Sequence, residues 1–214
     1  MLFKKALIFL FSKKCLLCGK RNEDWLCKNC EMRIKKLEKF KIIKFQDRNL
    51  DELIYFFKYE KIIRRLILQF KFFNKPYLLK VFTKIILKNE KLCGKIKIYD
   101  IIVPVPMHKI KKEIRGYNQT ELIASEIAEN LNIPYYKNLL IKNKNNKMQS
   151  SLTEKERYNN IKNVFKVLHT EKIKDKNIIL IDDIYTTGAT LEECAKVLKE
   201  AEARKVCGIV IAKD

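Results

Sequence analysis

The sequence lacks any long hydrophobic run. The apolar run near its N-terminus, Ala6 to Phe11, is six residues long, whereas a membrane span needs about 18. With 5 glycines, 4 prolines and 47% hydrophobic residues, the chain also lacks the composition of a disordered, collagen-like or low-complexity protein. Lysines 13 and 14 stand where a secretory signal would have its small-residue cleavage site. We therefore expect a folded, soluble protein of the cytoplasm.

Positive charge is abundant and unevenly distributed. The 214 residues include 46 basic and 25 acidic ones, a formal net charge of +21, and residues 1–100 hold 26 of the basic and 10 of the acidic residues. Clustered cations favour a polyanionic partner, because they release counterions condensed on phosphates. However, 38 of the basic residues are lysines, which an AT-rich genome would also produce, so charge alone leaves nucleic-acid binding open.

Four of the seven cysteines form one spaced motif, C-x2-C-x8-C-x2-C. Each C-x2-C pair can turn two sulfurs toward one point, and two pairs complete a tetrahedral shell suited to Zn²⁺. Without a secretion signal a disulfide framework is disfavoured, and a thioredoxin-like redox pair would need a single C-x2-C on a βαβ unit. Because four thiolates leave no open coordination position, we predict a structural zinc site formed by Cys15, Cys18, Cys27 and Cys30.

Hydrophobic periodicity predicts mainly helices before residue 98, and alternating strands and helices after it. We expect a short helix and linker over 31–48, a strand over 53–59, and two helices between Ile62 and Leu92 with a break at 74–76. From residue 98 onward strands and helices alternate, which indicates a parallel sheet. The expected strands cover 98–105, 178–181 and 205–212, the expected helices cover 119–131 and 189–201, and a long polar loop covers 142–160.

The stretch IILIDDIYTTGAT, residues 178–190, contains residue types typical of a ligand-binding site. It places Asp182 and Asp183 at the C-terminal end of a buried strand, where ligands of open α/β sheets bind. Two adjacent carboxylates can accept hydrogen bonds from a vicinal diol such as that of ribose, and the following helix N-terminus favours a phosphate. Gly188 lets the backbone approach the anion. An exposed Asp-Asp pair with threonine helix caps is the ordinary alternative, but the whole block predicts a ribose 5-phosphate pocket whose hydroxyl donors are Thr186, Thr187 and Thr190.

This block resembles the 5-phosphoribosyl-1-diphosphate (PRPP) motif of type I phosphoribosyltransferases. Further stretches narrow the resemblance to the ComF family, the competence-linked phosphoribosyltransferase-like proteins that carry an N-terminal four-cysteine zinc module. These stretches are IIVPVPMH (101–108), RGYNQ (115–119), KMQSSL (147–152) with Glu156, Arg157, Asn160 and Phe165, and Tyr59, Glu60, Arg64, Leu66, Ile67, Lys71 and Phe72.

The resemblance implies an α/β fold with a type I phosphoribosyltransferase-like parallel sheet flanked by helices, a small N-terminal zinc module and a helical hood. We accordingly divide the chain into a zinc-binding module and linker (1–48), a basic strand and helical hood region (49–97), and a phosphoribosyltransferase-like domain (98–214). Lys61 and Asn74 stand where the family often has glycine, and we expect these departures to affect local backbone geometry only.

Carried onto this sequence, the resemblance also implies a set of site residues. Asp182 and Asp183 would meet the ribose hydroxyls and carry any catalysis. Mg²⁺ would be coordinated by diphosphate and ribose oxygens rather than by a set of protein ligands. The 5-phosphate would lie on Tyr185, Thr186, Thr187, Gly188, Ala189 and Thr190, the diphosphate would face Val105, Pro106 and Met107, and a flexible loop over 143–157 would include Lys147, Gln149, Ser151 and Arg157.

Two functions remain open at this point. The resemblance implies a PRPP-binding protein of natural transformation, acting in the uptake or cytoplasmic handling of single-stranded DNA, with DNA-translocation machinery at the inner face of the membrane as a further partner. Candidate DNA-binding residues are Arg64, Lys71 and Arg115. The aromatics over 55–59 could stack bases, but we expect at least half of them to lie in the core. The alternative is an active phosphoribosyltransferase that transfers ribose 5-phosphate from PRPP to a nucleobase or amine, although no acceptor site is visible in the sequence.

Overall fold

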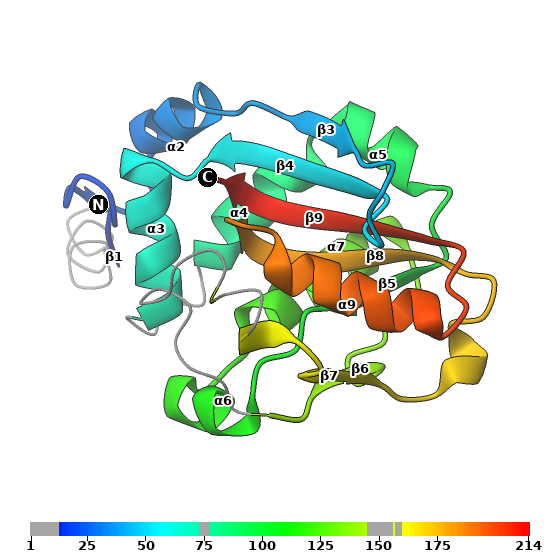
Figure 1. Cartoon of the computed structure of the whole chain (residues 1–214). Coiled ribbons are helices and arrows are strands. Elements are labelled where there is room, and N and C mark those ends of the chain that lie inside the picture. The colour runs from blue at the N-terminus through cyan, green and yellow to red at the C-terminus, as the bar shows by residue number, and fades with distance from the viewer. Residues whose placement is uncertain (1–12, 73–77, 145–155, 157–159) are drawn as a thin grey trace.

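The computed structural model describes residues 13–72, 78–144, 156 and 160–214, and is built around one five-stranded sheet (Figure 1). Its strand order is β3-β4-β9-β8-β5, where the pair β3–β4 is antiparallel and all other pairs are parallel. The predicted parallel sheet is therefore confirmed, with one antiparallel pair at its edge that was not predicted. The strands are β3 (Lys41–Lys44), β4 (Glu52–Lys58), β5 (Ile101–Pro104), β8 (Asn177–Tyr185) and β9 (Lys205–Lys213).

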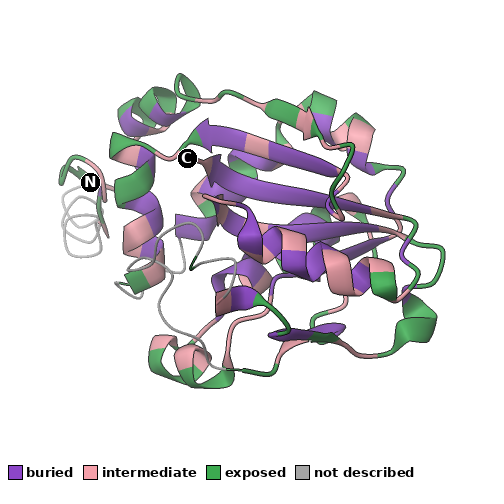
Figure 2. Cartoon of the chain, viewed as in Figure 1, coloured by how far each residue is buried: buried purple, intermediate pink, exposed green. Residues whose placement is uncertain are grey.

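Alternating side chains of the inner strands bury both faces of this sheet. Ile179 and Ile181 of β8 lie in one apolar cluster, and Ile178 and Leu180 lie in the other. Figure 2 shows the inner strands almost entirely buried. The first cluster includes apolar residues of α3 (Lys61–Phe72), α4 (Leu79–Leu87), α5 (Glu90–Ile96) and α7 (Gln119–Leu131), and the second those of α9 (Ala189–Glu200), β6 (Leu140–Lys142) and β7 (Phe165–Val167).

Short polar caps explain why several helices begin and end where they do. The Asn118 side chain accepts a hydrogen bond from the Thr120 N–H at the start of α7, and Asn132, with φ +52°, ends that helix. Asn89 caps α5 in the same way, so the predicted second helix is divided into α4 and α5. The connection after β5 contains α6 (Lys109–Arg115), which ends at Gly116 with φ +82°.

The N-terminal segment packs onto the first apolar cluster. It consists of β1 (Lys13–Lys14), β2 (Arg21–Asn22) and α2 (Lys28–Lys35). Leu26, Cys30 and Ile34 are buried in the same cluster as α3 and α4. Within the described ranges, no helix has the length and apolar character that crossing a membrane requires.

Several predicted elements are confirmed and others differ in extent. Of the four aromatics over 55–59, Phe56 and Phe57 are fully buried and Tyr55 and Tyr59 are partly buried, as expected for core residues. The edge strand β3 and the hairpin β6–β7 were not predicted. Because β4 pairs with β9, the sheet runs across the proposed boundary at residue 97. The three-part division of the chain stays a prediction.

Candidate ligand site at the carboxyl edge of the sheet

The acid pair lies at the carboxyl end of β8, an inner strand between β9 and β5. Asp183 is buried, with 3% of its surface exposed. Its Oδ1 pairs with Lys71 Nζ of α3 at 2.8 Å, and its Oδ2 accepts a hydrogen bond from Gln119 Nε2 of α7 at 2.8 Å. Both carboxylate oxygens are thus held by side chains that come from other parts of the chain.

Asp182 has a different environment from its neighbour. Its Oδ1 accepts a hydrogen bond from the Asp183 backbone N–H at 2.8 Å, and its side chain is partly buried. Burial and the adjacent Asp183 carboxylate raise the pKa of Asp182 to about 7. The pair therefore combines one carboxylate neutralised by a lysine with one that titrates near neutral pH.

A tight turn follows the acid pair and leads into α9. Gly188 has φ +83° and precedes the first residue of the helix, Ala189. The Tyr185 ring packs so closely under this glycine that any Cβ there would overlap the ring, 2.5 Å from Cζ. The Tyr185 hydroxyl in turn accepts a hydrogen bond from Arg48 Nη1 at 3.1 Å. Only glycine fits this turn, which brings the backbone of residues 186–188 to the N-terminal end of α9.

The turn after β5 lies beside the end of β8. The Val105 N–H donates to the Ile181 carbonyl at 2.9 Å, which continues the parallel pairing by one residue. The Val105 carbonyl accepts hydrogen bonds from the Asn118 amide at 3.2 Å and the Thr120 hydroxyl at 2.6 Å. Pro106 and Met107 follow and are partly buried. The structure thus brings the turn over 105–107 and the acid pair to the same edge of the sheet.

Three cationic side chains lie near the acid pair. Lys71 pairs with Asp183, Arg115 donates to Gln119 Oε1 at 2.5 Å, and Lys142 interacts with Asp182. Burial and the charge of Lys111 lower the pKa of Lys142 to about 8, against the opposing attraction of Asp182. Burial also lowers the pKa of Arg115. Since three cations lie near two carboxylates, the site has a surplus of positive charge suited to an anion.

The structure therefore gathers most of the predicted ligand residues at one edge. The acid pair, the turn over 185–190 and the turn over 105–107 lie together there. The loop residues Lys147, Gln149, Ser151 and Arg157 lie outside the described residues. Gln119, Lys142 and Arg48 were not predicted as site residues. Gln119 belongs to the RGYNQ stretch and could have been singled out, whereas Lys142 and Arg48 carry no signal in the sequence.

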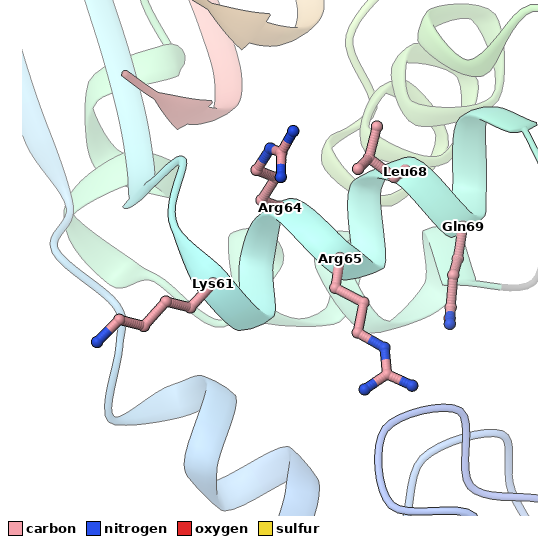
Figure 3. Close-up of a pocket in the computed structure, with 5 residues that line it drawn as sticks. All are labelled: Lys61, Arg64, Arg65, Leu68 and Gln69. Carbon is pink, nitrogen blue, oxygen red and sulfur yellow. The ribbon is translucent and has the colours of Figure 1, made fainter.

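The candidate DNA-binding residues lie in two places. Lys71 and Arg115 are at the acid pair, as described above. Arg64 lines an open cavity of about 380 Å³ on α3, together with Lys61, Arg65, Leu68 and Gln69 (Figure 3). Figure 3 shows Arg64 and Leu68 on one side of α3, and Lys61, Arg65 and Gln69 on the other. Neither Arg64 nor Arg65 forms an ion pair with another residue in the ranges the structure describes.

The four cysteines of the spaced motif come together near the N-terminus. Their sulfur atoms all lie within 4.8 Å of one another, and those of Cys18 and Cys27 are 3.8 Å apart. Sulfurs at the corners of a tetrahedron around Zn²⁺, each about 2.3 Å from the metal, would be about 3.8 Å apart. Although burial opposes ionisation, hydrogen bonds from the Cys27, Cys18 and Leu17 backbone lower the pKa of Cys15 to about 6. The residues present fit a closed four-thiolate metal site.

Comparison with known proteins finds a matching family model and two similar bacterial proteins. A family model described as "Phosphoribosyl transferase domain" matches residues 119–214. "Competence protein F" of Haemophilus influenzae is 27% identical over 165 residues, covering 75% of this chain and 72% of that protein. "Competence protein ComFC" of Bacillus subtilis is 29% identical over 191 residues, covering 87% of this chain and 71% of that protein. The chain is thus similar to the competence proteins of the ComF family, and these relatives support the resemblance predicted from its motifs.

The family match and the strand order of the sheet confirm the predicted fold of the type I phosphoribosyltransferase kind. Among solved structures, a purine phosphoribosyltransferase from Pyrococcus horikoshii is 17% identical, with a TM-score of 0.40, over 64% of this chain and 83% of that chain. The turn and helix after the acid pair both lie within the range that the family model matches.

Proposed function

We propose that this protein binds PRPP with Mg²⁺ at the carboxyl edge of its sheet and acts in natural transformation, in the uptake or cytoplasmic handling of single-stranded DNA. The observation that carries the proposal is the acid pair, which leads directly into the turn at Gly188 and the N-terminus of α9. The names of the two bacterial relatives, both competence proteins, support the process.

The chemistry of the edge matches the parts of PRPP. The two carboxylates would accept hydrogen bonds from the ribose hydroxyls, and the turn over 185–190 would hold the 5-phosphate at the helix N-terminus. The turn over 105–107 would face the diphosphate. Mg²⁺, when bound, would neutralise the diphosphate charge and lie on ligand oxygens. Lys71 now occupies Asp183 Oδ1, so we expect ribose binding to loosen that ion pair.

Zinc at the four cysteines would have a structural role in this account. A closed four-thiolate site offers no open position for a reactant, and its helix α2 is packed into the core beside α3. Fixing α2 would therefore help to position α3, the helix that supplies Lys71. The expected contact with DNA-translocation machinery at the inner face of the membrane stays a prediction from the family resemblance.

Calorimetric titration with PRPP and Mg²⁺ tests the proposal. We expect saturable binding, weakened about 10-fold or more by Asp183→Asn, because this change replaces a charged hydrogen-bond acceptor. The matched control is Asp175→Asn, since Asp175 is exposed, far from the edge, and has φ +58°, which asparagine tolerates. Equal affinities of the wild type and both variants would show that the ribose is held elsewhere.

Two further measurements separate handling of DNA from enzymatic transfer. Affinity for single-stranded DNA should fall steeply between low and physiological salt if the cations track phosphates. Diphosphate release in the presence of a panel of purines, pyrimidines and amines would instead identify a transferase. PRPP binding without release of its diphosphate in the presence of any of these acceptors would leave PRPP as a regulatory ligand.

A further inference from the structure

We propose that Phe72 and Arg115 form a stacking platform for a nucleobase beside the acid pair. The inference rests on the proposed function, because it names the second ligand of that same site. The platform would bind the base, for which the sequence alone showed no binding surface.

Phe72 is exposed in a way that core packing does not explain. Its side chain is 59% exposed, whereas Phe70 on the same helix is fully buried. Within the part of the chain that the structure describes, Phe72 is the single aromatic among the large apolar side chains that are exposed. Such a ring is free to receive a planar ligand.

One side of the ring is already covered by a guanidinium group. Arg115 Cζ lies 5.3 Å from the centroid of the Phe72 ring. Nucleobases stack on aromatic rings and also on arginine planes, and the cation adds to the attraction. Phe72 and Arg115 together therefore offer two stacking surfaces at one place.

The platform is held in a fixed position relative to the acid pair. Lys71, the residue before Phe72, pairs with Asp183 at 2.8 Å. The Tyr117 hydroxyl donates to the Phe70 carbonyl, and the two rings stack with centroids 5.9 Å apart. The two contacts of Tyr117 fix the last turn of α3 to the segment between α6 and α7 and do not depend on the Lys71–Asp183 pair, so a base would meet a preorganised surface.

A short chain of hydrogen bonds also joins the platform to the sugar subsite. Arg115 Nη1 donates to Gln119 Oε1 at 2.5 Å, and Gln119 Nε2 donates to Asp183 Oδ2 at 2.8 Å. A base on Phe72 would thus lie next to a ribose bound at Asp183. The base could be a free acceptor or part of single-stranded DNA, and the same stacking chemistry serves both.

Charge favours a nucleobase over an apolar protein partner as the occupant. Lys71 precedes the exposed ring in the chain and Arg115 lies over it, and Lys142 interacts with the nearby Asp182. Cations beside aromatic rings are the combination that binds single-stranded nucleic acid, where the phosphates meet charge and the bases stack. The net charge of +21 adds a general attraction for phosphates.

The first test measures binding of two single strands of equal charge at low salt. One is oligo-dT of about 12 nucleotides, and the other is an abasic strand of the same length. We expect Phe72→Ala to weaken oligo-dT binding about 5-fold or more, the lower end of what one stacked base contributes, and to leave the abasic strand unchanged. Phe72→Tyr should retain oligo-dT binding, which shows that the ring and not the fold is responsible.

The matched control is Ile114→Ala on α6. Ile114 is 83% exposed and apolar, so its loss removes a surface side chain without removing a stacking surface. It should leave both strands unaffected. Two results would count against the platform as a DNA site. In one, Phe72→Ala binds oligo-dT as well as the wild type does; in the other, it loses affinity for the abasic strand as much as for oligo-dT. Either result overturns the platform altogether if Phe72→Ala also binds free bases as the wild type does.

The second test distinguishes the source of the base. Adenine and uracil are titrated calorimetrically into the wild type and Phe72→Ala in the presence of PRPP and Mg²⁺. Loss of free-base binding in Phe72→Ala assigns the platform to an acceptor, and loss of oligo-dT binding alone assigns it to DNA.

PRPP is titrated alone into the same proteins. Absence of PRPP binding to the wild type contradicts the proposed function, whereas an effect of Phe72→Ala on oligo-dT still supports the platform.

Discussion

Asp182 should make the protein less stable as the pH rises from 5 to 7. The ordinary pKa of an aspartate, 3.8, applies to the unfolded chain, and burial beside Asp183 raises it to about 7 in the folded protein. Between these two values the folded state binds more protons than the unfolded state does. The free energy of unfolding therefore decreases with pH over this interval and levels off above it. Asp182→Asn removes this dependence.

The magnitude follows from the width of the interval. Each pH unit within it contributes up to about 1.36 kcal/mol, so the two units from pH 5 to pH 7 give an upper limit of about 2.7 kcal/mol. Asp182 keeps some contact with solvent, which reduces the cost of its charge. We expect about half of the limit, roughly 1–1.5 kcal/mol. The amide of Asp182→Asn can still accept from the Asp183 N–H.

Guanidinium unfolding at pH 5 and pH 7 measures the effect. The wild type should lose about 1–1.5 kcal/mol more between the two pH values than Asp182→Asn does. Asp175→Asn is the control, because Asp175 is exposed, and it should follow the wild type. Identical pH dependence of the wild type and Asp182→Asn would refute the assignment of a raised pKa to this carboxyl group.

Three other predictions concern backbone geometry and the metal. Gly188→Ala should lower stability by about 2 kcal/mol or more, since φ of +83° and the Tyr185 ring both oppose a Cβ; an unchanged melting temperature would contradict this. Lys61, with φ +38°, should be improved by Lys61→Gly, with a melting temperature about 1–3 °C higher; a decrease would show that its conformation is unstrained. A strong chelator should lower the melting temperature of the wild type and release zinc, whereas Cys18→Ser should be insensitive to chelation; equal insensitivity of both would rule out a stabilising metal.

Local patterns predicted much of the fold. The cysteine spacing is a local signal, and the four sulfurs meet as expected. Helix α7 has the predicted bounds because an asparagine caps each end. Strand β8, by contrast, continues four residues beyond the predicted end at Ile181, because its backbone pairs with β9 as far as Tyr185. Backbone pairing does not require apolar side chains. A prediction based on hydrophobicity alone therefore placed the end of the strand too early.

The partners of the acid pair could not be predicted. Lys71 and Gln119 reach Asp183 from two helices that lie far away in the sequence, and no periodicity encodes such contacts. Strand β3 was missed because it is short and lies exposed at the sheet edge. The exposure of Phe72 likewise depends on how α3 packs, since the helix buries one face and Phe72 lies off it.

A crystal structure of the protein grown with saturating PRPP and Mg²⁺ tests the central claim most directly. We predict that the ribose hydroxyls lie within hydrogen-bond distance of Asp182 and Asp183, that the 5-phosphate lies on the backbone of residues 186–188, and that Lys71 has moved away from Asp183 Oδ1. Bound PRPP at any other surface, with the ion pair of Lys71 and Asp183 intact, would contradict the account.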